Sequence, residues 1–442
     1  MLFQFLKYLQ PTHYFQIPNS AGMSVFPVVE TLPRQIKDQL QPDDEYTSNV
    51  SKAYDLSWQA IQKGCIPETD TYSTFEKLPL KDNYRFIRKN FNSVWVFYIF
   101  MLRLMSFHNP FKEISAWMAT RNVQRQSLIP SLDHMNNWDT SKSELISNAP
   151  KVSVIIPTLN RYSYLNDVLL DFEKQDYSNF EIIVVDQSDN FNKDFYKNYK
   201  LDINVVRQEE KALWLARNTA IKHAKGSIIA LSEDDVRIQP NWLSMHLKCL
   251  EVFNAEVSAG VFFPEGSSIP ESRSFFALAS QFATGNAMLY KSVFERVGLF
   301  DRQFEKQRMG DGEFGMRVYL KGIKSISNPL AYCVDVKAGT GGLREMGSWD
   351  AFRPSTFLSP RPIPSVVYFF RQYFGSGRTR LSLLRTIPLS VFPYQFKRNK
   401  PLLVIGTLLT IIIFPIIMYQ VFRSWQLASK KIKEGPQIEY LV

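Results

Sequence analysis

Three acidic residues follow a short apolar run near the middle of the chain. Residues 228–231 (IIAL) are typical of a buried strand, and Glu233, Asp234 and Asp235 come just after it. Carboxylates at the carboxyl end of a strand lie at the edge where open α/β sheets bind ligands. Two carboxylates separated by one residue can share a hard divalent cation, which commonly brings phosphates with it. The alternative is a solvated acidic turn before a helix, and the triplet alone leaves both interpretations open.

A second acidic cluster opens a helical pattern further along the chain. Asp311 lies between Gly310 and Gly312, and Glu313 and Arg317 follow it. The flanking glycines allow the backbone to bring the Asp311 carboxylate close to a ligand. The alternative role for Asp311 is to cap the N-terminus of the helix.

The elements that must position these carboxylates form an alternating pattern. The sequence predicts strands at 152–157, 180–185, 205–206 and 228–231, with helices at about 162–175 and 213–224 between them. Strands that alternate with helices in this way predict a mainly parallel α/β sheet. Because each strand ends in polar residues, we expect several loops to converge on one edge of the sheet.

Further polar features follow the predicted strands. Asp186 ends the strand at 180–185 and could cap the next segment or accept hydrogen bonds from a base or ribose. Arg217 could be a solvated helix charge, although the apolar residues beside it favour close packing. A later strand at 330–336 leads to a glycine-rich turn at 339–344, which could cradle phosphate.

The composition limits the class of protein. A chain of 442 residues can hold a sizeable core and about two or three structural units. Its three cysteines are far apart and form no CxxC pair, which argues against a disulfide scaffold or a structural zinc site. The net charge of +10 suggests nucleic acid, an anionic membrane surface or a phosphorylated substrate as a partner.

The C-terminal part has the composition of a membrane anchor. Residues 401–422 carry no charge and are long enough to span a bilayer, so we expect a transmembrane helix there and a basic tail at 423–442. The alternative for 401–422 is a buried core helix. Residues 348–400 mix aromatics with arginines, as expected of a basic amphipathic segment at the surface of anionic lipid. The membrane thus accounts for the basic charge, and no nucleic-acid-binding motif is present.

Residues 1–150 are expected to form an N-terminal accessory region that either contacts the membrane or lies on the acceptor side of the site. Within it, residues 93–105 (SVWVFYIFMLRLM) are apolar on all sides but short for a bilayer crossing. They predict either a buried helix or a helix that lies on the membrane surface.

Taken together, residues 151–345 resemble the family 2 glycosyltransferases of GT-A fold. The motifs that carry the resemblance are, in chain order, VIIPTLNR at 154–161, IVVDQS at 183–188, ARNT at 216–219, EDD at 233–235 and GDGEF at 310–314. Three positions depart from the family pattern. Glu233 stands where aspartate is usual, Gly310 replaces an acidic residue, and Asp335 stands where many members have a histidine metal ligand.

The resemblance implies a role for each matching residue. It implies an inverting transfer from a nucleotide-sugar, with Asp311 as the general base that takes the proton of the acceptor hydroxyl. Mg²⁺ or Mn²⁺ would be bound by Glu233, Asp235 and Asp335. The nucleotide-sugar would be bound by Pro157, Thr158, Asn160, Asp186, Arg217 and Asp234. The site would be supported, or the acceptor contacted, by Glu313, Arg317 and Asn286.

We therefore expect a membrane-anchored glycosyltransferase with an α/β, GT-A catalytic domain at 151–347 and a glycan or lipid-linked acceptor. The expected location is the inner (cytoplasmic) membrane, in single-pass topology, with the catalytic domain in the cytoplasm because of the basic residues before the apolar segment. Two alternatives remain open. A nucleotidyltransferase of similar fold would release pyrophosphate, and a non-catalytic scaffold or glycan-binding protein would keep the fold without turnover.

Overall fold

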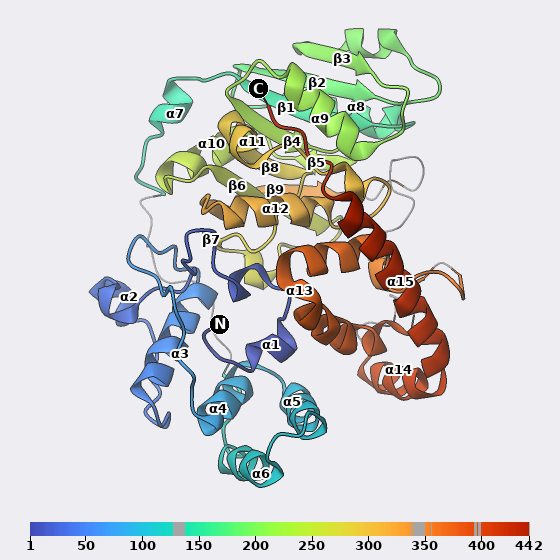
Figure 1. Cartoon of the computed structure of the whole chain (residues 1–442). Helices are drawn as coiled ribbons and strands as arrows, with labels where there is room; N and C mark the ends of the chain where they lie inside the picture. Colours follow the sequence, from blue (N-terminus) through green and yellow to red (C-terminus); the bar gives the residue numbers. More distant parts are fainter. Residues whose placement is uncertain are drawn as a thin grey trace. The chain divides into compact units, whose positions relative to one another are not determined.

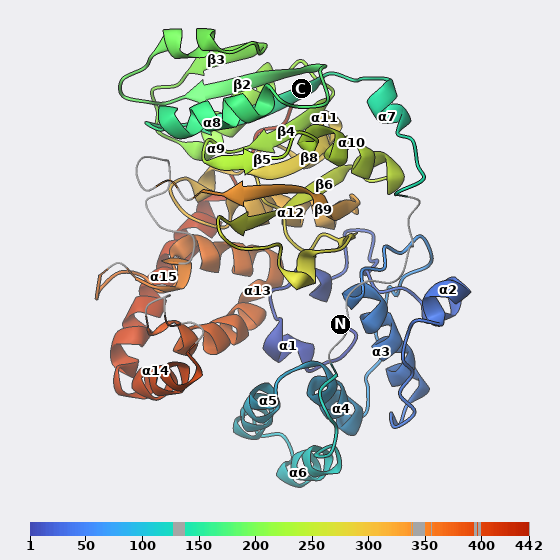
Figure 2. The same ribbon diagram turned by 180° about the vertical axis from the view of Figure 1, so that it is seen from behind.

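The computed structural model describes residues 1–126, 138–336, 338, 350–354, 356–392, 396 and 399–441. The glycine-rich turn at 339–344 therefore lies outside the described residues. The chain divides into two compact units, Met1–Met135 with Phe370–Leu389, and Asn136–Phe369 with Ser390–Val442. Figure 1 labels the elements of each unit, and Figure 2 shows the same elements from behind.

The first unit is helical. Its helices are α1 (Leu6–Leu9), α2 (Arg34–Lys37), α3 (Asn49–Gln62), α4 (Leu80–Asn90), α5 (Ser93–Met105) and α6 (Pro110–Ala119), with the larger part of α13 (Pro364–Thr386). Aromatic side chains build its core. Phe3 stacks on Phe86 with ring centroids 3.8 Å apart, and Trp58 meets Phe86 edge-on at 5.3 Å.

The second unit is built on one mixed sheet of nine strands, ordered β3-β2-β1-β4-β8-β6-β9-β5, with β7 paired to β9. The strands are β1 (Val152–Thr158), β2 (Phe180–Asp186), β3 (Ile203–Arg207), β4 (Ile228–Ser232), β5 (Val236–Ile238), β6 (Val257–Pro264), β7 (Ala277–Leu278), β8 (Asn286–Tyr290) and β9 (Ser325–Asp335). β1 to β4 are parallel to one another, whereas β8 runs antiparallel to β4 and β6. The predicted α/β class with a mainly parallel sheet is confirmed.

The register of β1 sets which residues share the carboxyl edge of the sheet. Thr158 pairs with Asp186 on β2, and Ile155 pairs with Leu231 on β4. Residue 158 lies three positions beyond residue 155, and residue 234 lies three positions beyond residue 231. The register therefore brings the ends of β1, β2 and β4 to one edge.

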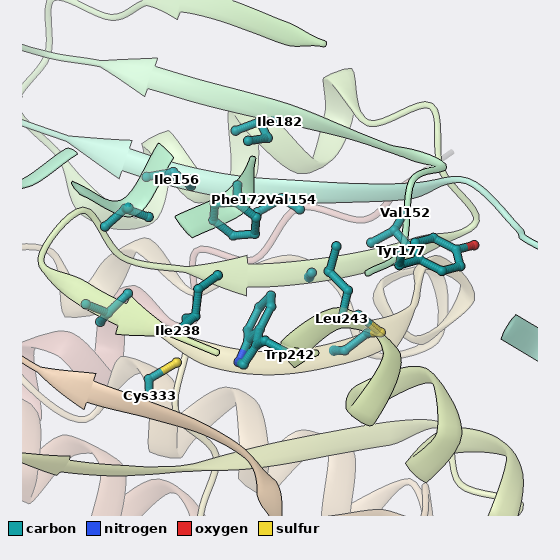
Figure 3. Close-up of a cluster of buried hydrophobic side chains, with 14 of the residues drawn as sticks. Val152, Val154, Ile156, Phe172, Tyr177, Ile182, Ile238, Trp242, Leu243 and Cys333 are labelled. Atoms are coloured by element: carbon teal, nitrogen blue, oxygen red, sulfur yellow. The ribbon is translucent and has the colours of Figure 1, made fainter. Parts of the chain in front are cut away.

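Helices cover both faces of the sheet (Figures 1 and 2). One face carries α8 (Tyr162–Phe172) and α10 (Trp242–Val252), and the other carries α9 (Leu213–His223), α11 (Lys291–Val297) and α12 (Gly310–Leu320). The short helix α7 (Glu144–Ser147) precedes β1. Figure 3 shows the core on the first face, where Val154 and Ile156 of β1 pack with Phe172 and Trp242. Alternate residues of β1 point to this face, as the pleat of a strand requires.

β9 is longer than the strand predicted at 330–336. It begins at Ser325, so Asn328 and Pro329 lie within it rather than before it. The register of β6 against β9 shifts between Gly260 and Val261, and the Asn328 side chain accepts a hydrogen bond from Leu330 N at 3.0 Å. This irregularity accommodates a proline inside a paired strand.

The predicted transmembrane segment forms two helices, α14 (Lys400–Ile412) and α15 (Phe414–Glu434). Pro415 lies in the first turn of α15, where a missing N–H needs no partner, so the proline starts a new helix. Among the described helices none is by itself long and apolar enough to cross a bilayer. Residues Val404–Ile412 and Phe414–Glu434 pass that test only as a pair, bent by 87°. The structure thus has two helices where we expected one helix at 401–422, and the membrane anchor remains a prediction.

The segment expected to be a basic tail is part of the second unit and packs against it. α15 extends to Glu434, and the chain beyond it runs alongside the loop that leads to α12. Leu299 N donates to Glu439 O at 2.7 Å, and Gln437 N donates to Asp301 Oδ1 at 2.9 Å.

We expected the apolar side chains of the segment at 348–400 to face lipid, but several of them are buried in protein. Val366, Val367 and Tyr368 in α13 are buried in protein, and Tyr368 Oη donates to Asp301 Oδ2 at 3.4 Å. An interfacial role for this segment stays a prediction.

Candidate functional site

The acidic triplet lies at the shared carboxyl edge of the sheet, as predicted. Thr158 at the end of β1 donates its hydroxyl hydrogen to Asp234 Oδ2 at 2.7 Å. Asp234 is buried, whereas Asp235 is partly open to solvent. Burial and the neighbouring Asp235 together raise the pKa of Asp234 to about 7, although Arg161 opposes the shift. The structure therefore brings together Thr158 and the two aspartates that the sequence assigned to the site.

Arg161 joins this edge from the loop between β1 and α8. Its Nη1 lies 3.2 Å from Asp234 Oδ1 and 2.9 Å from Asp235 Oδ2, so one guanidinium group bridges both carboxylates. No role was predicted for Arg161 from the sequence, although this residue ends the motif at 154–161 that carries the family resemblance. The bridge places positive charge where the two carboxylates would otherwise repel each other.

The residues expected to bind a metal lie near one another but do not form a complete coordination site. Asp335 at the end of β9 pairs with Val236, and Val336 N donates to the backbone oxygen of Asp235 at 3.2 Å. Within the described residues, no three or more His, Cys, Asp or Glu side chains are grouped so that they could hold a metal ion. Mg²⁺ is usually held by one or two carboxylates together with substrate phosphates. The carboxylates present fit that arrangement, in which the ligand completes the coordination.

Glu233 is held by Arg217, which the sequence left as either a solvated or a packed residue. The Arg217 side chain is fully buried, donates to Ser232 O at 3.3 Å and lies 3.3 Å from Glu233 Oε1. A buried guanidinium is tolerated only when hydrogen bonds and an opposite charge offset its desolvation. Gly285 packs closely against the Glu233 side chain, because a Cβ at residue 285 would lie 2.7 Å from Glu233 Cδ. Arg217 therefore fixes the Glu233 carboxylate at the end of β4.

Asp186 is enclosed by protein groups. Its Oδ2 accepts hydrogen bonds from the hydroxyls of Tyr162 at 2.6 Å and Tyr196 at 2.8 Å, and its Oδ1 accepts from Ser188 N at 2.8 Å. Burial, with the Asp186 charge, raises the pKa of both tyrosines. The side chain is fully buried, so the structure gives Asp186 a clear role in shaping the loop after β2. A contact with a nucleotide base remains a prediction.

Asn160 links the loops that follow β1 and β2. It adopts a left-handed backbone conformation with φ of 56°, which asparagine tolerates better than most residues. Its backbone N donates to Ser188 Oγ at 2.8 Å, and its side chain donates to Asp189 Oδ2 at 2.8 Å. Pro157 lies beside Val185 inside the sheet. Asn160 thus holds the two loops together through hydrogen bonds, and its contacts with a ligand remain a prediction.

Asp311 occupies the first turn of α12 and is partly exposed. Its Oδ1 accepts from Gly312 N at 2.9 Å within the first turn, but the N-cap position belongs to Met309, so the alternative role of Asp311 as the N-cap is wrong. The preceding residue, Gly310, packs against the indole ring of Trp214 at the start of α9. A Cβ at Gly310 would lie 2.5 Å from Trp214 Cε2 and closer still to Cζ2. The tryptophan explains physically why a glycine stands beside Asp311.

Glu313, which is buried, and Arg317, which is partly buried, form an ion pair one helical turn apart on α12. Arg317 Nε lies 2.8 Å from Glu313 Oε1, and Arg317 Nη2 donates to Glu313 Oε2 at 3.0 Å and to Leu299 O at 2.9 Å. Glu313 is thus occupied in holding α12 against the loop at 297–299. This favours the supporting role over contact with an acceptor.

Asn286 lies in the sheet core, away from solvent. Its Oδ1 accepts from Trp242 Nε1 at 2.9 Å and lies 2.9 Å from His246 Nε2, while its Nδ2 donates to Val261 O and Ala331 O. These partners use all of its hydrogen-bonding capacity. Asn286 is therefore placed as a support of β8.

Comparison with known proteins supports the family that the motifs at this edge of the sheet indicate. Residues 153–300 match the family model described as "Glycosyl transferase family 2". The chain is 27% identical over 163 residues to "Glycosyltransferase GlyA" of Streptococcus pneumoniae, covering 36% of this chain and 22% of that protein. It is 26% identical over 266 residues to "Chondroitin synthase" of Pasteurella multocida, covering 46% and 28%. The chain therefore spans less than a third of the length of either relative.

Among solved structures, the chain is similar to S. aureus TarS 1-349 in complex with UDP-GlcNAc. The TM-score is 0.43 and the sequence identity 16%, with 64% of this chain and 92% of that chain covered. The matched segment begins in β1 and contains Thr158, Asp186 and the acidic triplet. Residues 153–300 thus form a family 2 glycosyltransferase domain, and the family predicted from the motifs is confirmed.

Proposed function

We propose that the protein is a membrane-associated glycosyltransferase that moves a sugar from a nucleotide-sugar donor to a glycan or lipid-linked acceptor. The observation that carries this proposal is the Thr158–Asp234–Arg161–Asp235 group at the carboxyl edge of the sheet, inside the segment that matches the family. Ligands of open α/β sheets bind at that edge.

The charges of this group suit a diphosphate bound together with a divalent cation. Asp235 would hold Mg²⁺ or Mn²⁺, with Glu233 and Asp335 beside it, and such an ion neutralises the charge of a departing diphosphate when bound. Without a cation, Arg161 pairs with Asp234 and Asp235. A cation at Asp235 would release the guanidinium, which could then hydrogen-bond a phosphate oxygen.

Asp311 is the carboxylate that we assign to proton transfer. It is partly exposed at the start of α12, whereas its neighbour Glu313 is buried and paired with Arg317. Asp311 would accept the proton of the acceptor hydroxyl as that oxygen attacks the anomeric carbon from the side opposite the diphosphate. Attack from that side inverts the configuration of the carbon.

The membrane location is proposed from the C-terminal third of the chain. Residues 351–433 contain no Asp or Glu but 13 Arg and Lys, and α14 and α15 expose apolar side chains such as Leu408, Ile411 and Phe414. Anionic lipid attracts such basic segments. We propose that this part anchors the protein to the inner membrane with the glycosyltransferase domain on the cytoplasmic side.

The test is product analysis with a panel of UDP-, GDP- and dTDP-sugars and a membrane glycolipid extract as acceptor, in Mn²⁺ and in EDTA. Release of a nucleoside diphosphate that requires the metal is the expected result. Release of pyrophosphate would instead identify a nucleotidyltransferase. No product from any donor, with folded protein, would overturn the proposal in favour of a non-catalytic scaffold.

A further inference from the structure

The α5–α6 hairpin of the first unit exposes an apolar surface that its fold does not use. Residues 93–105 form α5, but only Val96 and Ile99 of that helix are buried, so the interpretation as a buried helix is wrong. Met105, Phe107 and Phe111, around the turn between the helices, are 72%, 97% and 81% exposed. Phe97 on α5 and Met118 on α6 extend the same exposed apolar set. Solitary exposed apolar residues are ordinary, whereas a contiguous set marks an interaction surface.

The opposite side of the hairpin is fixed by buried polar contacts, so the orientation of the apolar side is set by the fold. Glu113 on α6 accepts from Tyr84 Oη at 2.7 Å and pairs with Arg103 Nη2 of α5 at 2.6 Å. Arg88 on α4 donates to Trp117 O at 3.1 Å. These contacts hold α5 and α6 together and direct Phe107 and Phe111 outward.

The charges around the apolar surface are of one sign. Glu113 is the only acidic residue between 92 and 126, and its carboxylate is buried. Lys112, Arg121 and Arg125 in the same stretch are exposed. Exposed aromatics and methionines among cations, with no exposed acid, are the composition of helices that lie in the interface of an anionic bilayer. At 13 residues, α5 is about 20 Å long, which is short of the roughly 30 Å of a hydrocarbon core.

We propose that the α5–α6 hairpin inserts in the plane of an anionic phospholipid leaflet and is a membrane contact in its own right, separate from α14 and α15. This rests on the membrane location proposed above. Insertion would bury Phe107 and Phe111 among acyl chains and place Lys112 and Arg121 at the level of the lipid phosphates. The first unit thereby holds the protein at the leaflet independently of the C-terminal helices.

The direct test is to read the depth of single fluorophores on the full-length protein. Because the three native cysteines, Cys65, Cys249 and Cys333, are buried, a maleimide dye can be placed at Phe107→Cys. With vesicles of phosphatidylcholine and phosphatidylglycerol, we expect a blue-shifted emission that lipids brominated on their acyl chains quench. A dye at Leu170→Cys, on the exposed side of α8, is the matched control and should remain unquenched.

A dye at Ile411→Cys, at the end of α14, separates this inference from the proposed anchor. Quenching at 411 with none at 107 overturns the hairpin proposal and leaves the C-terminal anchor standing. Quenching at 107 with none at 411 supports the hairpin and contradicts the anchor. Failure of either membrane contact leaves the assay of nucleoside diphosphate release unaffected.

The double substitution F107S/F111S tests the energetic contribution of the hairpin. We expect vesicle partitioning to weaken about a hundredfold, because each phenylalanine contributes on the order of tenfold when buried in an apolar phase. L170S should leave partitioning unchanged. Partitioning that F107S/F111S leaves unchanged would overturn the proposal. So would a concentration-dependent dimer in light scattering that the double substitution abolishes, because a second copy would then cover this surface.

Discussion

The contact between Gly310 and Trp214 yields a quantitative prediction about the helix that carries Asp311. In G310A, the new Cβ would lie 2.5 Å from Trp214 Cε2, well inside van der Waals contact. The indole cannot simply turn aside, because it is buried and its Nε1 donates to Phe304 O at 3.0 Å. Overpacking a core in this way costs about 1–3 kcal/mol. We expect G310A to lower the free energy of unfolding by that amount.

The assay is urea unfolding followed by circular dichroism, with G377A as the matched control. A Cβ at Gly377 meets nothing within 4 Å, so alanine there should be neutral or mildly stabilising. W214F should relieve the clash, because the atoms that Cβ approaches belong to the outer ring that phenylalanine lacks. The two substitutions should therefore couple favourably by about 1 kcal/mol or more in a double-mutant cycle. A fully stable G310A, or additive effects of the two changes, would refute the reasoning.

Three further predictions follow from buried or bridging charges. E313A should destabilise the protein by about 3–5 kcal/mol in urea unfolding, because it removes the buried carboxylate that pairs with the largely enclosed Arg317. A loss below about 1 kcal/mol would contradict a stabilising role for this pair. In calorimetry, R161A should bind Mn²⁺ more tightly in the absence of donor, since Arg161 now pairs with Asp235. The same variant should bind a nucleoside diphosphate more weakly. Unchanged affinities would show that Arg161 is not part of the site. Burial lowers the pKa of His246 to about 4, below its unfolded value of about 6.5, so its contribution to stability is complete above pH 6.5 and lost as the pH falls toward 4. Wild type should lose about 2 kcal/mol more than H246Q between pH 7 and pH 5, and equal losses would contradict this.

The parallel part of the fold could be predicted because its signals are local. The β-branched run of β1, the helical spacing of α8 and the apolar run before the acidic triplet each reflect burial on a parallel sheet. The carboxyl edge followed from the same pattern, and with it the meeting of Thr158, Asp234 and Asp235. The antiparallel strands β5, β7 and β8 did not follow, because they are short and their pairing depends on long-range register.

Several site features depend on contacts that no local pattern contains. The two tyrosines on Asp186 come from different segments, and Tyr196 reaches it only because the chain folds back after β2. The clash that explains Gly310 requires Trp214, which is 96 positions earlier in the sequence. The Glu313–Arg317 pair, in contrast, has the i, i+4 spacing of a helix and could have been predicted.

The apolar C-terminal segment shows where composition alone is insufficient. Its length and lack of charge predicted one helix, but the break at Ile413, before Pro415, gives two helices bent by 87°. Hydropathy measures the apolar character and length of a segment, and it does not predict where a proline can start a new helix.

The assignment of Asp311 as the base is tested most directly by D311N. Its side chain is nearly the same size, and its oxygen can still accept the hydrogen bond of Gly312 N, so folding and donor binding should be retained. We predict that D311N shows the same thermal shift with its nucleotide-sugar and metal as the wild type, but loses at least about a hundredfold in the rate of nucleoside diphosphate release. A D311N protein that turns over at the wild-type rate would contradict the assignment of Asp311 as the base.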